Sequence, residues 1–399
     1  MKQRWICWAL IALCVCIVNL ASAGEASPGR AAGAATENDQ ILETFSVAKN
    51  GDGLLLPVVI GDKTYPFVVD TGCTCSGVDS SLVVGKPKAS RDLLTPAGTV
   101  SLQIFDPPNA RVGGFRLRDT VSEVVGVDMS GLREASGVDF FGMLGMDFLS
   151  QHVIRIDFDK GELSFLKTAD HVSGTPQWML PNEFNVPTVL GWVSVNRGPE
   201  RFILDTGAWG AHTTGAIGKP LLNDLVKREN YRQLGTGLSE TVAGTGHGRI
   251  VQGARLHFGE FVMDDPVFGE AETTHLGLWC LSRFNVTLDF PRRLIYLRER
   301  KASTRAEKID ATEARLYRKG GKVLLSFVGD ASRAKRAGLK AGDEILKVAG
   351  LETIDASLDK LQNAISVNDA PVHVIASRMG SRIEAAMHVD ASAADPKSR

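Results

Sequence analysis

The stretch FVVDTGCTCSG, residues 67–77, runs from an apolar strand into the tripeptide Asp70-Thr71-Gly72. This tripeptide alone is weak evidence of function, because Asp-Thr-Gly is also an ordinary way to end a strand in a turn. A second copy occurs in FILDTG, residues 202–207, which ends in Asp205-Thr206-Gly207. The chain therefore carries two aspartates in the same local context.

The two tripeptides belong to a longer repeated pattern. Three further features recur after each tripeptide in the same order, namely Thr95-Pro96-Ala97-Gly98-Thr99 with Thr241-Val242-Ala243-Gly244-Thr245, Leu144-Gly145 with Leu276-Gly277, and Asp157-Phe158 with Asp289-Phe290. Ordered self-similarity of this kind indicates an internal duplication. Short apolar runs between turn residues favour strands, so we predict two homologous β lobes, residues 44–170 and 180–299.

Two facing carboxyl groups form a complete chemical set for peptide hydrolysis. When carboxyls about 3 Å apart share one proton, one pKa falls and the other rises, which leaves a base and an acid together at working pH. The base takes a proton from water, and the acid hydrogen-bonds the carbonyl oxygen of the substrate. Glycine after each aspartate lets the other carboxylate approach, and threonine can hydrogen-bond across the pair.

The motifs VVDTGC and ILDTGA, each followed by an apolar-Gly turn and a closing IDF or LDF hairpin, resemble the retropepsin-like aspartic proteases. The resemblance covers residues 45–300 and implies a mainly β fold, with two acid-protease β-barrel lobes in one chain. It implies that Asp70 and Asp205 are the catalytic pair. It also implies supporting positions: Thr71 and Thr206 as cross-braces, Gly72 and Gly207 as close-approach positions, and Gly145 and Gly277 in the apolar-Gly motif.

The same resemblance predicts two flaps over the substrate, at residues 98–115 and 244–257. Cys73 and Ala208 stand where members of the family often carry Ser or Thr. His212 and His247 have no Ser or Cys nucleophile motif beside them, which makes them poor candidates for a catalytic base.

A third unit follows a charged, apolar-poor linker at residues 300–312. We predict strands at 323–327 and 372–376 and a helix near 358–365. The segment AGLKAGDEILKVAG, which begins at Ala337, resembles the one that bacterial PDZ domains use. The resemblance implies a small α+β PDZ domain at residues 313–390.

PDZ domains capture C-terminal peptides by strand addition and by a loop of backbone amides. The Gly-apolar-Gly loop expected for that purpose is not evident, since the sequence offers only Gly320-Gly321 before the first long strand. The residues that would bind a C-terminal peptide stay unassigned. Peptide capture and a purely structural or docking role are both open.

The first residues, MKQRWICWALIALCVCIVNLASAG, combine two basic residues with an apolar run and a small-residue pattern. This order predicts a signal peptide at residues 1–23 and a flexible leader at 24–43. We expect an exported protein of bacterial type, periplasmic or extracellular, with no stable membrane insertion after cleavage. An uncleaved membrane anchor is the alternative. The polar tail, residues 391–399, is expected to fray.

Charge and cysteine usage argue against several other classes of protein. Lys plus Arg number 45 against 46 for Asp plus Glu, so the net charge of -1 provides no global field for nucleic acid. Cys73, Cys75 and Cys280 remain after signal cleavage, an odd number that cannot form a full disulfide framework. No His or Cys set has zinc spacing. We therefore expect packing thiols, no metal and no cofactor.

These features together predict an exported aspartic endopeptidase. Its polypeptide substrate would be gripped as an extended strand between the lobes, and the PDZ domain would recruit or dock it. Two alternatives stay open. The chain could be a catalytically inactive peptide-binding scaffold, or it could form a homodimer that pairs Asp70 with Asp70 of a second copy.

Overall fold

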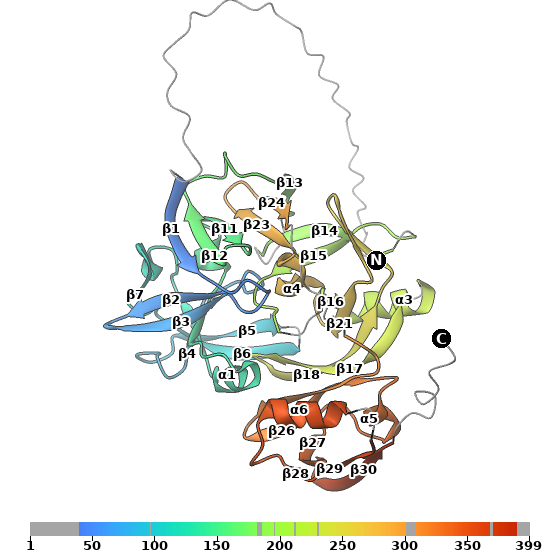
Figure 1. Cartoon of the computed structure of the whole chain (residues 1–399). Coiled ribbons are helices and arrows are strands. Elements are labelled where there is room, and N and C mark those ends of the chain that lie inside the picture. The colour runs from blue at the N-terminus through green and yellow to red at the C-terminus, as the bar shows by residue number, and fades with distance from the viewer. Residues whose placement is uncertain are drawn as a thin grey trace, which may run out of the picture. The chain divides into compact units, whose positions relative to one another are not determined.

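The computed structural model describes residues 40–388 except 96, 182–185, 195, 211–212, 230, 301–308 and 368–369 (Figure 1). The predicted signal peptide and the predicted polar tail lie outside these described residues. Within them, no helix is long and apolar enough to cross a membrane. The described chain is mainly β, as the sequence predicts.

Three segments follow one another along the chain. The first half, residues 41–166, contains β1 (Ile41–Ser46), β2 (Leu55–Ile60), β3 (Lys63–Val69), β4 (Gly77–Asp79), β5 (Ala89–Thr95), β6 (Gly98–Phe105), β7 (Ala110–Val112), β8 (Phe115–Arg116), β9 (Val124–Val127), α1 (Ser130–Ser136), β10 (Gly142–Leu144), α2 (Met146–Leu149), β11 (Val153–Asp157) and β12 (Glu162–Leu166).

The second half, residues 175–299, contains β13 (Thr175–Trp178), β14 (Thr188–Trp192), β15 (Glu200–Asp205), β16 (Gly215–Gly218), α3 (Lys219–Arg228), β17 (Arg232–Thr241), β18 (Gly244–Gln252), β19 (Arg255–Phe258), β20 (Phe261–Asp264), β21 (Val267–Ala271), β22 (His275–Gly277), α4 (Leu278–Leu281), β23 (Phe284–Asp289) and β24 (Leu294–Glu299). The C-terminal unit, residues 309–388, contains β25 (Ala314–Lys319), β26 (Lys322–Gly329), α5 (Arg333–Arg336), β27 (Glu344–Val348), β28 (Leu351–Glu352), α6 (Leu358–Ser366), β29 (Val372–Arg378) and β30 (Ser381–Met387).

The main sheets of the two halves have the same strand order. In the first half the order is β5-β6-β9-β4-β10-β3-β2-β7-β8. In the second half it is β17-β18-β21-β16-β22-β15-β14-β19-β20, so each strand has a counterpart at the same place. The second sheet then continues from β17 into β26 of the C-terminal unit. Each half therefore places one Asp-Thr-Gly turn at the same point of its sheet.

A third sheet joins the two halves through their closing strands. Its order is β1-β12-β11-β23-β24-β13, and β11 pairs antiparallel with β23 from Val153 opposite Asp289 to Ile156 opposite Val286. Here the prediction of β-barrel lobes is wrong, because the sheets of the described residues are open. The closing hairpin of each half pairs with that of the other half and does not close its own sheet into a barrel.

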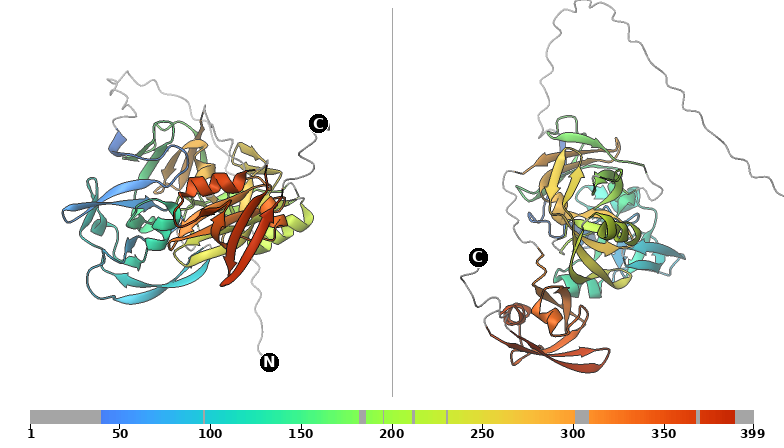
Figure 2. Two further views of the ribbon diagram at one scale, coloured as in Figure 1. Left: turned by 60° about the horizontal axis from the view of Figure 1, so that its bottom comes forward. Right: turned by 90° about the vertical axis from the view of Figure 1, so that its right-hand side faces the viewer.

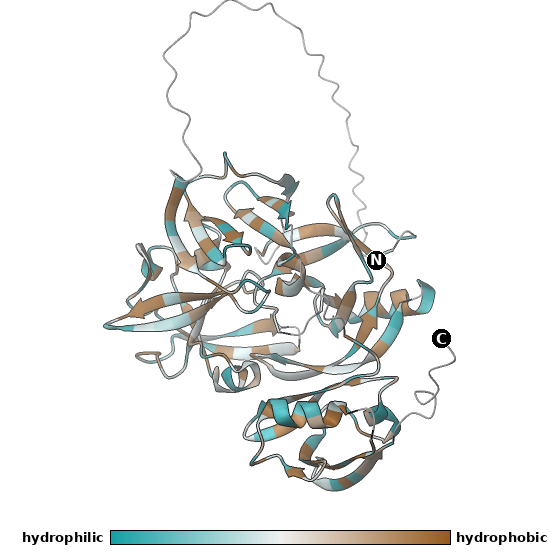
Figure 3. Cartoon of the chain, in the orientation of Figure 1, coloured by the Kyte–Doolittle hydropathy of each residue, from teal (hydrophilic) through white to brown (hydrophobic). Residues whose placement is uncertain are grey.

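Buried apolar residues explain why the strands pack in this way. The largest core cluster contains residues of both halves, including Phe67 and Phe202, which are 0% exposed and lie just before the two aspartates. Figure 3 shows apolar residues along the strands of both halves. Burial of such side chains contributes about 1.5–3 kcal/mol each, so these strands are anchored immediately before the turns that they carry.

The C-terminal unit has a core of its own. Ile345 and Val348 of β27 are buried and pack with Leu361 of α6. The predicted helix near 358–365 is confirmed as α6, and the two predicted strands lie within β26 and β29. Figure 2 shows α6 beside the strands of this unit.

Two predicted boundaries differ from the structure. Strand β1 begins at Ile41, inside the predicted leader, because it pairs with β12 from Leu166 to Glu162. Most of the predicted linker, 300–312, lies outside the described residues, but Ile309 within it is buried against Phe327 of β26. In both places the folded unit extends into a segment that is polar on average, because a few apolar side chains of that segment pack against it.

We expect the sheet that joins the halves to contribute strongly to stability. Leu288 of β23 is 1% exposed and lies opposite Ile154 of β11. Leu288→Ala should lower the free energy of unfolding by about 2–5 kcal/mol, since it removes a buried side chain and leaves a cavity. Urea denaturation of the full chain measures this. Val262→Ala, at a residue that is 52% exposed, is the control, and equal effects of the two substitutions would contradict the expectation.

Candidate active site

Asp70 and Asp205 occupy equivalent places at the ends of two strands. Asp70 directly follows β3, and Asp205 is the last residue of β15. Each strand lies inside its sheet, between an antiparallel neighbour (β2 or β14) and a parallel one (β10 or β22). Strands held on both sides fix the position of the side chains at their ends.

The two Asp-Thr-Gly turns face each other at close range. A Cβ atom added at Gly72 would lie 2.5 Å from Cγ of Asp205, and one added at Gly207 would lie 2.4 Å from Cγ of Asp70. In protein structures, Cβ atoms essentially never lie within 3.0 Å of a heavy atom that is not their chain neighbour. Each carboxyl group therefore lies against the glycine of the opposite turn, where a larger residue would separate the pair.

The threonines of the two turns hydrogen-bond each other reciprocally. The backbone N–H of Thr71 donates to Oγ1 of Thr206 at 3.0 Å, and the N–H of Thr206 donates to Oγ1 of Thr71 at 3.1 Å. Each hydroxyl also donates to a carbonyl of the other half, from Thr71 to Leu204 and from Thr206 to Val69. The predicted hydrogen bonding across the pair is confirmed by these contacts.

Backbone amides hold each carboxylate in its own turn. Oδ1 of Asp70 accepts from the N–H of Gly72 at 3.0 Å. Oδ1 of Asp205 accepts from the N–H groups of Gly207 and Ala208 at 2.9 and 3.0 Å. Hydrogen bonds of this kind favour the ionised carboxylate and lower its pKa.

Burial outweighs these hydrogen bonds at both aspartates. Burial and the charge of Asp205 raise the pKa of Asp70 to about 8, and burial raises the pKa of Asp205 to about 6. Two negative charges in one poorly solvated space repel each other, so the two groups titrate as a pair. Near neutral pH the pair therefore holds one proton and can supply an acid and a base together.

Gly145 and Gly277 lie directly behind the two turns. A Cβ atom at Gly145 would lie 2.4 Å from the carbonyl of Cys75, and one at Gly277 would lie 2.8 Å from the carbonyl oxygen of Ala208. The residue after each glycine donates its N–H to a carbonyl of the adjacent turn, at 2.9 and 2.8 Å. Each turn is thus supported from behind by backbone that has no room for a side chain.

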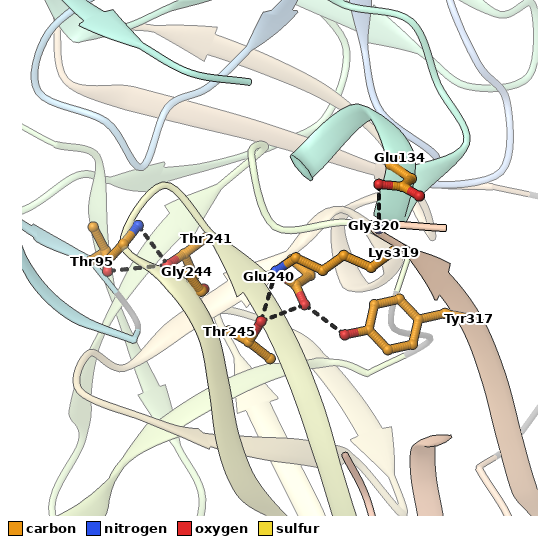
Figure 4. Close-up of polar contacts among 10 residues, drawn as sticks. Thr95, Glu134, Glu240, Thr241, Gly244, Thr245, Tyr317, Lys319 and Gly320 are labelled. Atoms are coloured by element: carbon orange, nitrogen blue, oxygen red, sulfur yellow. Dashed lines mark hydrogen bonds and ion pairs between the residues drawn. The ribbon is translucent and has the colours of Figure 1, made fainter. Parts of the chain in front are cut away.

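Two long hairpins extend from the main sheets, and their tips meet. Strands β5 and β6 form one hairpin, and β17 and β18 form the other. At the first tip, the hydroxyl of Thr95 accepts from the N–H of Ala97 and donates to the carbonyl of Gly98. At the second tip, the hydroxyl of Thr241 accepts from the N–H of Ala243 and donates to the carbonyl of Gly244. These two hydroxyls lie 3.4 Å apart (Figure 4).

The hairpins begin earlier in the chain than the flaps that the sequence predicts. The predicted segments, 98–115 and 244–257, start at Gly98 and Gly244, which are turn residues at the tips with φ of 129° and 105°. The outgoing strands, β5 and β17, precede these glycines. They carry few consecutive apolar residues, so their sequences give little sign of a strand.

Trp209 is a residue of the site that the sequence analysis missed. Its side chain packs against the same buried cluster as Cys73, Leu93 and Val242. Leu93 and Val242 come from the two hairpins, whereas Cys73 and Trp209 come from the turns that carry the aspartates. An apolar wall therefore connects the hairpins with the turns. The one signal for it is an aromatic residue in the glycine-rich segment after Asp205.

Asp147 was also missed, and it supports the first turn. It accepts from the hydroxyl of Ser76 at 2.6 Å and from the N–H of Ser76 at 2.9 Å. The same hydroxyl accepts from the N–H of Gly145 at 3.1 Å. Burial raises the pKa of Asp147. The second half carries Trp279 at the corresponding place, so the sequence repeat gave no signal for this carboxylate.

The side chains of Cys73 and His247 make contacts with groups other than the two aspartates. The Cys73 thiol donates to the carbonyl of Cys75 at 3.0 Å, and all three cysteines of the described chain are free. His247 lies against Gly342 of the C-terminal unit, and His212 is outside the described residues. Among residues that the structure describes, no group of three or more His, Cys, Asp or Glu side chains is arranged to hold a metal ion.

Comparisons with known proteins give no family for this chain. No protein-family model matches it, and no curated protein matches it. Any inference about function therefore depends on the geometry of the two turns, the hydrogen bonds between their threonines and the raised pKa values of their aspartates.

We expect Thr71→Val to loosen the two turns. It removes the acceptor of the Thr206 N–H and the donor to the Leu204 carbonyl, and a buried polar group without a partner costs about 1–3 kcal/mol. Thr71→Ser keeps the hydroxyl and is the matched control. Chemical denaturation of both variants measures the difference, and equal stability of the Val and Ser variants would contradict a bracing role for the hydroxyl.

The raised pKa values predict a pH-dependent effect of Asp70→Asn on stability. The folded pair keeps a proton to higher pH than unfolded aspartates, whose pKa is 3.8, so rising pH destabilises the folded wild type relative to the variant. The variant's unfolding free energy should exceed that of wild type by on the order of a few kcal/mol at pH 8, and by much less at pH 5.

Urea denaturation at steps between these two pH values tests this, with Asp62→Asn as the control. Asp62 is exposed and follows β2. A difference between Asp70→Asn and wild type that stays constant from pH 5 to pH 8 would contradict a raised pKa in the pair.

Proposed function

We propose that this protein is an aspartic endopeptidase in which Asp70 and Asp205 form the catalytic dyad. The observation that carries the proposal is the reciprocal placement of the two carboxyl groups against Gly207 and Gly72. Aspartates with a purely structural role in turns are not expected to lie together in a poorly solvated space, because the repulsion between their carboxylates opposes folding. Acid–base catalysis by two carboxyls that hold one proton would explain why the two groups lie so close together.

The dyad performs hydrolysis with no further group. The ionised carboxylate takes a proton from a water molecule between the two aspartates, and the resulting hydroxide attacks the carbonyl carbon of the peptide bond. The protonated carboxyl donates to the carbonyl oxygen as negative charge develops there. Transfer of a proton to the amide nitrogen then lets the C–N bond break, and the pair is again left with one proton.

The architecture of the halves supports the same proposal. Each half repeats one strand order around its Asp-Thr-Gly turn, which fits two retropepsin-like lobes in a single chain, although their sheets are open. The tips of the two hairpins meet through Thr95 and Thr241. A polypeptide bound as an extended strand beneath these hairpins would present one peptide bond to the dyad. No nucleic acid, metal or cofactor is part of the proposal.

The pairing of Asp70 with Asp205 in one chain favours a monomeric site over a homodimer that pairs Asp70 with Asp70. A scaffold that binds peptides without cleaving them is the second candidate function, and Cys73 is the feature that favours it, since its thiol donates to Cys75 and not to the dyad. Export to the periplasm or the extracellular space is part of the proposal and depends on the N-terminal sequence alone.

The C-terminal unit, proposed as a PDZ domain, fits a docking role better than peptide capture. The side-chain amide of Gln362 on α6 accepts from the N–H of Leu316 at 2.8 Å and donates to the carbonyl of Ala314 at 2.9 Å. These are backbone groups of β25 that strand addition would need. A C-terminal peptide would have to displace Gln362 to add to this edge.

Turnover of a mixed peptide library between about pH 3 and 8 tests the dyad. Asp70→Asn and Asp205→Asn should each lower kcat/KM by about 10³-fold or more, because neither can share the proton that both steps need. Asp62→Asn is the control and should match wild type. Circular dichroism and gel filtration establish that the variants are folded and whether the active species is a monomer.

Three results would contradict the proposal. Wild type could be inactive on every peptide, Asp70→Asn could retain activity, or Asp205→Asn could retain it. Retained activity in Asp205→Asn alone, with activity confined to a dimer, would favour the intermolecular pair. An inactive wild type that still binds peptides would favour the scaffold.

A further inference from the structure

The β17–β18 hairpin has a neighbour on each side, and the β5–β6 hairpin does not. The first half of β17, away from the tip, pairs with β26 of the C-terminal unit, from Gly235 opposite Gly329 to Gly237 opposite Phe327. In the described first half, β5 lies at the end of its sheet and pairs with β6 only. Strand β6 meets β9 only from Gln103 to Phe105, and β18 likewise meets β21 only from Ile250 to Gln252. The pairing with β26 therefore distinguishes the second hairpin from the first.

Glu240 links the second hairpin to the C-terminal unit (Figure 4). Its carboxylate accepts from the hydroxyl of Tyr317 at 2.8 Å and from that of Thr245 at 2.9 Å, and it pairs with Lys319 at 2.5 Å. The side chains of Glu240 and Lys319 are 14% and 27% exposed. Removing one member of such a shielded pair leaves the other charge without a partner, which is costly.

The C-terminal unit also holds the first half through the turn between β25 and β26. Gly320 and Gly321 have φ of 59° and 70°, the left-handed conformations that a two-residue hairpin turn requires. Their N–H groups donate to the two carboxylate oxygens of Glu134 on α1, that of Gly321 at 2.8 Å (Figure 4). These amides are therefore occupied by a carboxylate of the same chain.

Apolar contacts reinforce the attachment of the second hairpin. Leu234 and Ile250 of the hairpin pack with Ile309 and Phe327 of the C-terminal unit in one small cluster. Lifting this hairpin would expose the cluster as well as break the strand pairing. The β5–β6 hairpin is tied sideways by Arg91 to Glu123, whose side chains are 47% and 34% exposed, and an ion pair this exposed contributes about 0–1 kcal/mol.

We infer that the C-terminal unit is a clamp that holds the β17–β18 hairpin in a fixed position over the dyad, so that the β5–β6 hairpin alone moves to admit substrate. The clamp consists of the β17–β26 pairing and the Glu240–Tyr317–Lys319 contacts. The role of the moving hairpin in substrate entry rests on the proposed function. The clamp itself does not rest on the proposed function, because the stability of the two hairpins can be measured whether or not the protein cleaves peptides.

Hydrogen exchange of the full chain tests the clamp without any need for activity. Amides of residues 90–102 should exchange about tenfold or more faster than those of 235–249. The double variant Tyr317→Phe/Lys319→Met should raise exchange in 235–249 about tenfold and leave 90–102 unchanged. Lys322→Met is the matched control, because Lys322 lies on the same hairpin of the unit and pairs with Glu344 at the surface.

Two results of this exchange experiment would overturn the clamp. One is equal exchange of the two hairpins in wild type, and the other is exchange in 235–249 that responds no more to the double variant than to Lys322→Met. Unfolding of the C-terminal unit in the double variant is recognised by faster exchange in α6. In that case Glu240→Gln, which alters only the hairpin side of the contact, replaces it with the same expectation.

A reversible link between the hairpin tips tests substrate entry. A Cβ atom at Gly246 would lie 3.2 Å from that of Ala97, close to the separation that a disulfide needs. The double variant Ala97→Cys/Gly246→Cys should lose turnover when oxidised and recover it with a reductant, whereas each single variant should not respond. Full turnover in the linked protein would overturn entry past the β5–β6 hairpin. Absence of turnover in the unlinked wild type would instead refute the proposed function and leave the clamp standing.

Discussion

The exchange of hydrogen bonds between Thr71 and Thr206 is the constraint on which the candidate site depends. Two carboxylates do not attract each other, so Asp70 and Asp205 must be held together by other groups. The N–H and hydroxyl groups of both threonines are buried and bond across the two halves. Separating the turns would leave several polar groups without partners in a dry interior. The two turns therefore behave as one rigid element.

This rigidity explains the residue types around the aspartates. Because the threonines fix the separation of the turns, the space between them is too small for any residue but glycine at positions 72 and 207. The same closeness keeps water from solvating two charges, which raises the pKa values of both aspartates. Steric fit and shared titration thus have one cause, the reciprocal bonding of the threonines.

Local features of the site could be predicted from sequence, and features set by long-range pairing could not. The repeated tripeptide pointed to Asp70 and Asp205, and the helix α6 lies where the sequence predicts it. The prediction of β-barrel lobes was wrong because nothing in the sequences of β11 and β23 indicates that these strands pair with each other. Trp209 and Asp147 were missed because neither has a counterpart in the repeat. The hairpins were misplaced because β5 and β17 gain their order from neighbours and not from apolar content.

The two halves of a single chain can have different neighbours, and here the two hairpins differ in this way. Both hairpins end in the same threonine-centred turn, yet among their described strands only β17 pairs with a strand of the C-terminal unit. Two identical subunits with identical sequences would place the same partner on both hairpins or on neither. Once the halves are joined in one chain, a unit appended after the second half can hold the nearer hairpin and leave the other free. Under the proposed function, substrate access to the two aspartates would then depend on contacts at Glu240 and along β26.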